Sequence, residues 1–474
     1  MVEAIRKSLR ESAAARWTAM AVVSFSMLCG YFVADVAAPL KPLLEQQLHW
    51  TSSQYGFFTS SYGWFNVFLG MLVIGGIILD KKGPRFAGML SVILMVLGCG
   101  MKWWAIQTHA LDGSVFSFNL GSWNVAVPWQ VMLASLGYAI FGMGIELCGI
   151  TATKIIVKWF KGYEIALAMG LQVAIARIGT SLALGVSLPI AKAFKVSTPI
   201  LVGFLLLGVG LVAFIFYLGM DKKLDASDPS GVTGSNPEDE FRFSDIFAIL
   251  GNKGWWYIAI LCALFYSGVF PFLKYATDLM VQKFHVSENL AGLIPSLLPV
   301  GAMLLTPTFG GIYDKKGKGA TIMVMGSVLI MTVHIIFAVP FLNNWLIAVF
   351  AMLLLGVGFS LVPSAMWPSV PKIIPERQLG TAYALIFFLQ NLVALMFAPW
   401  FIGFVLDKWC ITGKTIVQKM IDGRMQDVTI TSYNYMIPMM VFTSFGVLAI
   451  VFALLLKAED KKKGYGLELP NQKS

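Results

Sequence analysis

Long apolar stretches constrain this chain more than any other feature of its sequence. Runs of 18 or more mostly apolar residues recur along its whole length, and each can cross a bilayer as a helix. Only 13% of the residues are charged, far fewer than in a typical soluble protein. Lipid offers the backbone no hydrogen bonds, and the alternation typical of a membrane barrel is absent. The sequence therefore predicts an all-α membrane protein.

The apolar stretches fall into two groups of six. A polar segment, residues 221–253, separates the groups and is the one plausible linker. We expect an N-terminal six-helix half at 1–220 and a C-terminal half at 254–474, which ends in a charged tail. The twelve transmembrane helices are expected at about 17–39, 54–80, 85–107, 127–152, 164–193, 197–220, 254–281, 289–313, 319–340, 344–371, 377–406 and 431–457.

One turn of the chain occurs twice. Residues 76–83 and 310–317 both read Gly-x-x-x-Asp-Lys-Lys-Gly, and each copy follows the second apolar run of its half. Internal repeats of this size are typical of transporters built from two matching halves.

A second repeat supports the duplication. Lys154-Ile-Ile ahead of Gln172 matches Lys372-Ile-Ile ahead of Gln390 at a constant offset of 218 residues, whereas the two turns are 234 apart. The first half therefore carries extra residues, and we assign them to a polar loop at 110–127.

The positive charges predict which end of the bundle faces the cytoplasm. With the N-terminus inside, the inside segments hold 24 of the 35 Lys and Arg residues and the outside loops hold 8. Both termini, the linker and both copies of the turn are then cytoplasmic. Because the cations lie in short loops between spans, the net charge of +10 reflects topology and indicates no nucleic-acid partner.

Missing motifs narrow the function. No Walker-type loop is present, so ATP hydrolysis is not the expected drive. The five cysteines lack the spacing of a metal site or a disulfide framework. We expect a transporter and not an enzyme, with no cofactor and no metal, working as a monomer. Its partners are a small-molecule substrate and the lipid bilayer, and coupling to protons is left open.

Charges inside the spans are the first candidates for a binding site, because an ionisable group at membrane depth is costly and tends to be functional. Arg177 lies about 20 Å deep in the fifth span, and Glu146 lies about 12 Å from the cytoplasmic end of the fourth. Arg177 could fork onto a substrate carboxylate while Glu146 takes an ammonium. Two alternatives stay open: a structural salt bridge between the two residues, and a role for Glu146 as a proton carrier.

Five other polar residues in the spans are candidate substrate contacts. Tyr31 and Asp35 lie one turn apart in the first span, and Tyr62 and Asn66 lie one turn apart in the second. Lys274 lies in the seventh. Asp35 and Lys274 could gate the outer side, touch the substrate, or reach out to the membrane surface.

The twelve spans and the repeated turn resemble the major facilitator superfamily. That resemblance implies two pseudo-symmetric halves that give alternating access to a central site. It also implies gating by the turns, in which Gly76 allows a close helix approach and charges latch the two halves on the cytoplasmic side in the outward-open state. The expected latch residues are Asp80, Lys81 and Arg85 in the first copy, and Asp314 and Lys315 in the second.

Shorter motifs resemble one branch of that superfamily, the lysosomal dipeptide carriers and their bacterial relatives. They include Tyr31-Phe-x-x-Asp35, Tyr62-x-Trp64-x-Asn66 and Phe-Pro-Phe at 270–272. The resemblance implies that Glu146 holds the ammonium of a peptide and Arg177 its carboxylate.

We therefore expect a secondary active or facilitative transporter of a small zwitterionic solute, a dipeptide or amino-acid-like compound by preference. One alternative is a carrier of small organic anions, in which Arg177 and Lys274 share the substrate and Glu146 handles a proton. Another is a sensor or scaffold that keeps the fold without transport. The outside loops lack an Asn-x-Ser/Thr sequon and the tails lack an acidic dileucine signal, which favours a bacterial inner membrane over an organelle.

Overall fold

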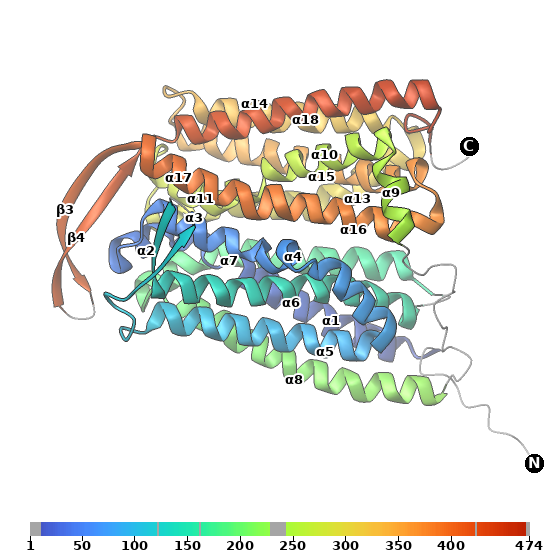
Figure 1. Ribbon diagram of the computed structural model, residues 1–474, viewed down its shortest axis with the longest axis horizontal. Helices are drawn as coiled ribbons and strands as arrows, with labels where there is room; N and C mark the ends of the chain where they lie inside the picture. The colour runs from blue at the N-terminus through green and yellow to red at the C-terminus, as the bar shows by residue number, and fades with distance from the viewer. Residues whose placement is uncertain (1–10, 121–122, 161–162, 228–242, 422–423, 471–474) are drawn as a thin grey trace, which may run out of the picture.

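A computed structural model describes residues 11–120, 123–160, 163–227, 243–421 and 424–470. Long helices lie side by side in two bundles, one from each half of the chain (Figure 1). The first bundle holds α1 (Ala13–Asp35), η2 (Ala38–Leu40), α2 (Lys41–Leu48), α3 (Ser52–Ser60), η3 (Ser61–Gly63), α4 (Trp64–Phe68), α5 (Met71–Gln107), α6 (Trp129–Phe160), α7 (Ile165–Ala193) and α8 (Thr198–Ser227).

The second bundle follows a short amphipathic helix, α9 (Phe243–Leu250). Its elements are α10 (Lys253–Ser267), α11 (Phe270–Gln282), α12 (Glu288–Ala291), α13 (Leu293–Lys316), α14 (Gly319–Ala338), α15 (Trp345–Ile373), η6 (Glu376–Gln378), α16 (Leu379–Gln390), the π-helix η7 (Asn391–Phe397), α17 (Ala398–Trp409) and α18 (Met436–Lys463).

Among the described residues, eleven helical stretches are long and apolar enough to cross a membrane. They agree with the twelve expected spans, because α5 contains both the end of the second span and the third span, joined across a kink at Gly83. The start of the second span consists of α3, η3 and α4, each too short to span alone. The predicted fold class, twelve helices in two six-helix halves, is confirmed.

The repeated turn has the same backbone role in both halves. Gly83 has φ +79° where α5 kinks between the second and third spans, and Gly317 has φ +67° between α13 and α14. Residues with a Cβ rarely adopt such a conformation, so glycine is required where the chain reverses direction. This requirement explains why the sequence repeats a glycine at this point of each half.

Two of the segments that connect spans contain antiparallel hairpins. Strand β1 (Val115–Leu120) pairs with β2 (Trp123–Pro128) inside the predicted 110–127 loop, and β3 (Ile411–Ile421) pairs with β4 (Arg424–Tyr433) after α17. Both segments are rich in β-branched and aromatic residues, which favour strands. The loop predicted at 110–127 thus lies between two spans, and the pairing of its strands was not predicted.

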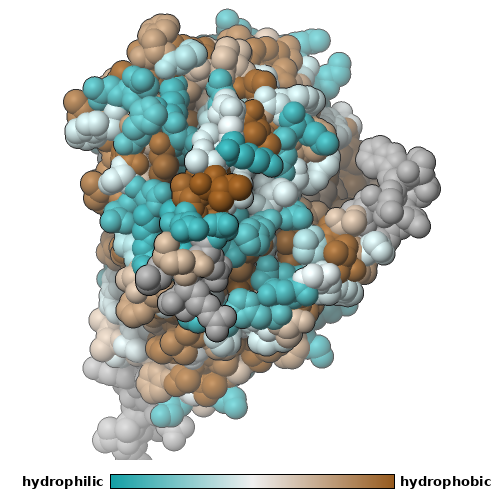
Figure 2. All heavy atoms as spheres, turned by 90° about the vertical axis from the view of Figure 1, so that its left-hand side faces the viewer, coloured by the Kyte–Doolittle hydropathy of each residue, from teal (hydrophilic) through white to brown (hydrophobic). Residues whose placement is uncertain are grey.

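The two hairpins define one end of the bundle, here called the hairpin end. The start of α1, the end of α18 and both copies of the turn lie at the opposite end, here called the terminal end (Figure 1). Figure 2 looks onto the hairpin end, where hydrophilic residues gather across the face as expected for a surface in contact with water.

The two halves touch closely at the hairpin end. A Cβ on Gly56 of α3 would lie 2.8 Å from the carbonyl oxygen of Pro399 in α17, and one on Gly292 would lie 2.0 Å from the carbonyl oxygen of Leu184 in α7. At the terminal end, by contrast, Gly76 and Gly310 have open space beside them. The halves are therefore closed against each other toward the hairpin end, whereas these two glycines meet no other residue at the terminal end.

Candidate functional site

A cavity of about 420 Å³ lies between the two halves. The first half lines it with many polar side chains, and the second half lines it mainly with aromatic and aliphatic ones. The predicted site residues that line it are Tyr31, Asp35, Tyr62, Glu146, Arg177 and Lys274.

Asn66, the seventh predicted contact, lies behind the cavity. Its side chain is 1% exposed, and its amide donates to the side-chain oxygen of Asn391 in the π-helix at 3.4 Å. It therefore joins the two halves at their seam. The same amide lies 3.4 Å from the backbone carbonyl of Tyr62 and 3.5 Å from that of Gly142, so it faces α6 and the seam.

Arg177 projects from the middle of α7. Its guanidinium carbon lies 5.5 Å from the ring centroid of Tyr31 and 5.2 Å from that of Phe359 in the second half. Within the described residues it forms no hydrogen bond or ion pair. A guanidinium placed on two aromatic rings is oriented, yet its N–H donors stay available for a carboxylate.

Glu146 projects from α6 and accepts a hydrogen bond from the hydroxyl of Tyr62 at 2.9 Å. Among the ion pairs within the described residues, none joins Glu146 to Arg177 or to any other cation. The structural salt bridge considered from the sequence is therefore not formed in this conformation. The cavity holds one anion and one cation that do not neutralise each other.

Asp35 and Lys274, in contrast, are already paired across the halves. The Lys274 amine lies 2.7 Å from a carboxylate oxygen of Asp35 and donates to the Ala34 carbonyl at 2.8 Å. Thr180 donates to the other Asp35 oxygen at 2.9 Å. With the hydroxyl of Tyr138 at 3.4 Å, the amine is well supplied with partners. The two side chains close the cavity toward the hairpin end.

A second buried ion pair joins the halves farther toward the hairpin end. Lys41 of α2 lies 2.7 Å from Asp278 of α11, and both side chains are essentially unexposed. Glu45 and Tyr435 complete this cluster, the first at 2.8 Å from the Lys41 amine and the second as a donor to Asp278. Nearby, the Asp407 carboxylate accepts from the backbone of Ser52 at the start of α3.

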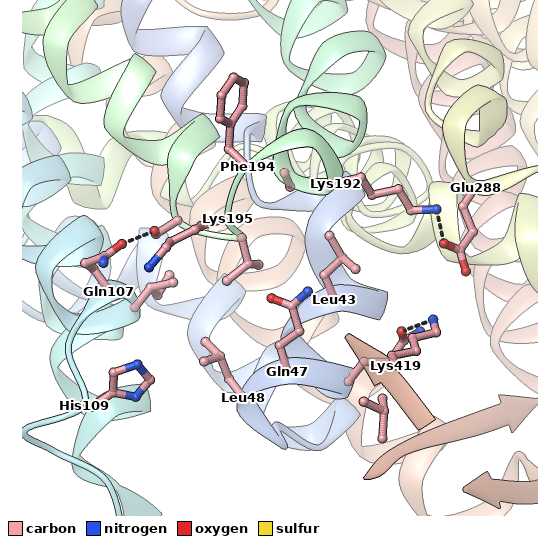
Figure 3. Close-up of a pocket in the computed structure, with 16 residues that line it drawn as sticks. Leu43, Gln47, Leu48, Gln107, His109, Lys192, Phe194, Lys195, Glu288 and Lys419 are labelled. Atoms are coloured by element: carbon pink, nitrogen blue, oxygen red, sulfur yellow. Dashed lines mark hydrogen bonds and ion pairs between the residues drawn. The ribbon is translucent and has the colours of Figure 1, made fainter. Parts of the chain in front are cut away.

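Figure 3 shows a separate recess of about 290 Å³ at the hairpin end. Two contacts between the halves border it: Lys192 of α7 pairs with Glu288 of α12, and Lys419 of β3 donates to Gln46 of α2 at 2.9 Å. The hairpin end is thus held shut by several polar contacts between the halves.

The charges of the first turn pair within their own half. Asp80 accepts from Lys154 of α6 at 2.6 Å, while Arg85 lies 2.8 Å from Asp225 of α8. Lys81 is exposed and Gly76 has no close neighbour. The charge pairs of Asp80 and Arg85 therefore lie within the first half and do not join it to the second.

The second copy differs from the first. Lys372, which the repeat matches to Lys154, donates to the backbone carbonyls of Gly466 and Leu469 beyond α18. Asp314 and Lys315 lie in the turn at the end of α13, and the side chain of Lys315 is exposed.

Sequence reasoning missed most of the second-half lining. Gln172 and Gln390, which the repeat pairs, both line the cavity, so the repeat itself could have identified them. The aromatic lining carried no such signal, since these residues resemble any others in an apolar span. The members not predicted include Tyr138, Tyr266, Phe270, Trp367 and Phe387. No group of His, Cys, Asp or Glu suited to a metal occurs in the described residues.

The sequence pattern of the Major Facilitator Superfamily matches residues 23–399, most of the chain. The chain belongs to this superfamily. One solved structure of similar fold is that of the nucleoside transporter NupG. It has a TM-score of 0.66 at 14% identity, and the match covers 93% of this chain and 98% of that chain. A bacterial homologue of the human lysosomal transporter Spinster, in an inward-facing and unoccupied conformation, has TM-score 0.65 at 12% identity and covers 98% of this chain and 99% of that chain.

Curated relatives of this superfamily member include the lysosomal dipeptide transporter MFSD1 of Bos taurus, 27% identical over 390 residues, which are 80% of this chain and 76% of the relative. MFSD1 of Homo sapiens is 26% identical over 390 residues, which are 80% of this chain and 77% of the relative. The resemblance to the superfamily and to its dipeptide-carrier branch is confirmed. The protein is an integral, multi-pass membrane protein of a transporter family.

Proposed function

We propose that this protein is a secondary carrier for small zwitterions, with dipeptides preferred, and that Glu146 and Arg177 hold the two ends of the substrate. Arg177 binds the free carboxylate through two parallel N–H donors. Glu146 binds the free ammonium. Similarity to proteins named dipeptide transporters supports the substrate class.

The observation that carries the proposal is that the two opposite charges share one cavity without pairing with each other. An isolated charge at membrane depth is costly, and a carrier regains that cost when a ligand of opposite charge binds. The organic-anion alternative requires Lys274 to share the substrate, but Asp35 already engages its amine at 2.7 Å. A zwitterion matches the two remaining charges, the Glu146 carboxylate and the Arg177 guanidinium.

Transport follows from rocking of the two halves around this site. By the distribution of positive charge we assign the terminal end to the cytoplasm, so the structure corresponds to an inward-open state. Asp35, Lys274, Lys41 and Asp278 then form the closed outer gate. Opening that gate requires these pairs to separate while the turns at 76–85 and 310–319 approach the opposite half.

The membrane in which the carrier works also belongs to the proposal. The missing sequon and dileucine signal favour a bacterial inner membrane, whereas the names of the curated relatives are lysosomal and do not favour it. Dipeptide transport across either membrane fits the site.

End-blocked peptides test the function. Glycylglycine should raise the melting temperature of the purified protein, because a ligand that binds only the folded state stabilises it. N-acetylglycylglycine lacks the ammonium and glycylglycinamide lacks the carboxylate, so neither should stabilise the protein. If the acetylated peptide and simple carboxylates stabilise it as well as glycylglycine does, the anion-carrier alternative replaces this proposal.

A further inference from the structure

The two ends of the proposed clamp lie in different surroundings. Glu146 has neighbours from its own half: the Tyr62 hydroxyl is its hydrogen-bond partner, and Gly149 and Thr153 line the cavity one and two turns farther along α6. Arg177 instead reaches the second half, where its guanidinium lies 5.2 Å from the ring centroid of Phe359. A substrate residue held by Arg177 therefore faces both halves.

Phe359 belongs to a packed aromatic trio with Tyr266 and Phe270. Tyr266 and Phe270 are stacked with their centroids 4.9 Å apart, and Phe359 lies 6.0 Å from the first and 5.9 Å from the second. Phe359 is buried behind the other two, which line the cavity. Such packing makes a firm apolar surface directly beside the guanidinium.

The second half places no free charge at this surface. By the 218-residue offset of the repeat, Glu146 corresponds to Ser364 and Arg177 to Leu395, and Leu395 lines the cavity. The remaining cation of the second-half lining, Lys274, is held by Asp35. A charged substrate side chain would lose its water at this surface, and the aromatic rings themselves offer it no ion-pair partner.

We infer that the trio of Tyr266, Phe270 and Phe359 is a side-chain subsite for the substrate residue that carries the free carboxylate, and that it selects large apolar or aromatic side chains. Successive side chains of an extended peptide point to opposite sides. The side chain of the ammonium-bearing residue therefore points away from the trio. This inference rests on the proposed function, because it needs Arg177 to hold the carboxylate.

Isomeric dipeptides provide the test. Glycylphenylalanine and phenylalanylglycine have the same composition, charge and apolar area, and differ only in which residue carries the ring. Binding of each to the purified, detergent-solubilised carrier is measured by thermal shift and calorimetry, with glycylglycine as the reference. We expect glycylphenylalanine to bind about tenfold more tightly than phenylalanylglycine, and glycylaspartate to bind more weakly than glycylglycine.

Two variants locate the effect. Phe270→Ala should remove the preference for glycylphenylalanine over phenylalanylglycine. Phe387→Ala is the matched control, because Phe387 also lines the cavity but its ring packs on Trp367, which is not a member of the trio. It should keep the preference.

The outcomes separate the two claims. Equal binding of the isomers, or tighter binding of phenylalanylglycine, overturns the subsite while the proposed function stands. Loss of the preference in Phe387→Ala but not in Phe270→Ala also overturns it. If glycylglycine and both isomers fail to bind the wild-type carrier, the dipeptide function itself fails and the subsite with it.

Discussion

The two halves share one fold but divide the chemistry of the cavity unequally. Positions matched by the repeat hold Glu146 and Arg177 in the first half and Ser364 and Leu395 in the second. Gln172 and Gln390, in contrast, are identical and both line the cavity. Duplication kept the helical frame, whereas the charges that suit a zwitterion are found in one half and the apolar wall in the other.

The halves differ again at the terminal end. Lys154 binds the Asp80 carboxylate at 2.6 Å, but its counterpart Lys372 binds backbone carbonyls of the segment that follows α18. That segment also caps α14, since the Glu468 carboxylate accepts from the backbone and hydroxyl of Thr321 at 2.9 Å. The two copies of the turn thus have different surroundings. Residues 468–470 lie against Gly317 in the second copy, whereas Gly83 in the first copy has open space beside it.

Replacing Arg177, the cation that the first half contributes to the proposed clamp, should have the largest effect on substrate binding. Arg177→Ala leaves the substrate carboxylate without its proposed partner, and losing one member of a buried charge pair costs about 3–5 kcal/mol. We expect glycylglycine binding to disappear, and Arg177→Lys to fail as well because an ammonium cannot reproduce the two-pronged contact. Leu395→Ala, at the matched position, should change affinity only a few-fold. Calorimetry checks all three, and near-normal binding by Arg177→Ala would contradict the clamp.

Glu146→Gln should discriminate among the roles considered for the anion. If Glu146 holds the ammonium, the variant loses zwitterions and keeps weak binding of simple carboxylates. A proton carrier would instead keep exchange and lose accumulation driven by a pH gradient. Uptake and counterflow in proteoliposomes separate these results. Unchanged dipeptide binding with unchanged accumulation would remove Glu146 from the site.

Weakening the contacts that join the halves at the hairpin end should have the next largest effect, on the balance between the closed and the open gate. Asp278→Asn leaves the buried Lys41 with Glu45 alone and weakens the closed gate by an amount on the order of 3 kcal/mol. The population should shift toward opening of the hairpin end. All five native cysteines are free and buried. A cysteine introduced at exposed Glu11 or Phe341 should be labelled equally in both states and therefore provides the reference. A cysteine at Ser53, beside Asp407, should react faster in the variant. Equal labelling would show that this pair does not hold the gate.

The sequence predicted the fold because twelve apolar runs and a repeated turn have few other solutions in a membrane. It singled out Arg177 and Glu146 as candidates because a charge at bilayer depth stands out, and both line the cavity. The aromatic trio could not be predicted, since Phe or Tyr in an apolar span reads alike whether it faces lipid, core or cavity. The Lys41–Asp278 pair joins residues 237 apart, and only the packing of the halves reveals it. Asn66 contacts Asn391 across the seam and is not among the residues that line the cavity, which its position one turn from Tyr62 did not indicate.

The first turn should give the smallest effect and the sharpest contrast with the second. Asp80 and Lys154 are 61% and 41% exposed, and such pairs contribute about 0–1 kcal/mol. Asp80→Asn should therefore leave stability nearly unchanged. Asp80 is proposed to latch the halves when the terminal end closes. Loss of that latch should raise the ratio of molecules with an open terminal end to molecules with a closed one, by up to about fivefold for 1 kcal/mol.

A cysteine at Gly310, which has open space in this state, reports that shift as faster labelling. The matched change in the second half, Lys372→Met, should not alter Gly310 labelling. It should instead expose the tail, so that a cysteine replacing the fully buried Leu467 becomes reactive. If Asp80→Asn and Lys372→Met produce the same labelling pattern, the two turns act alike and the asymmetry between the halves ends at the cavity.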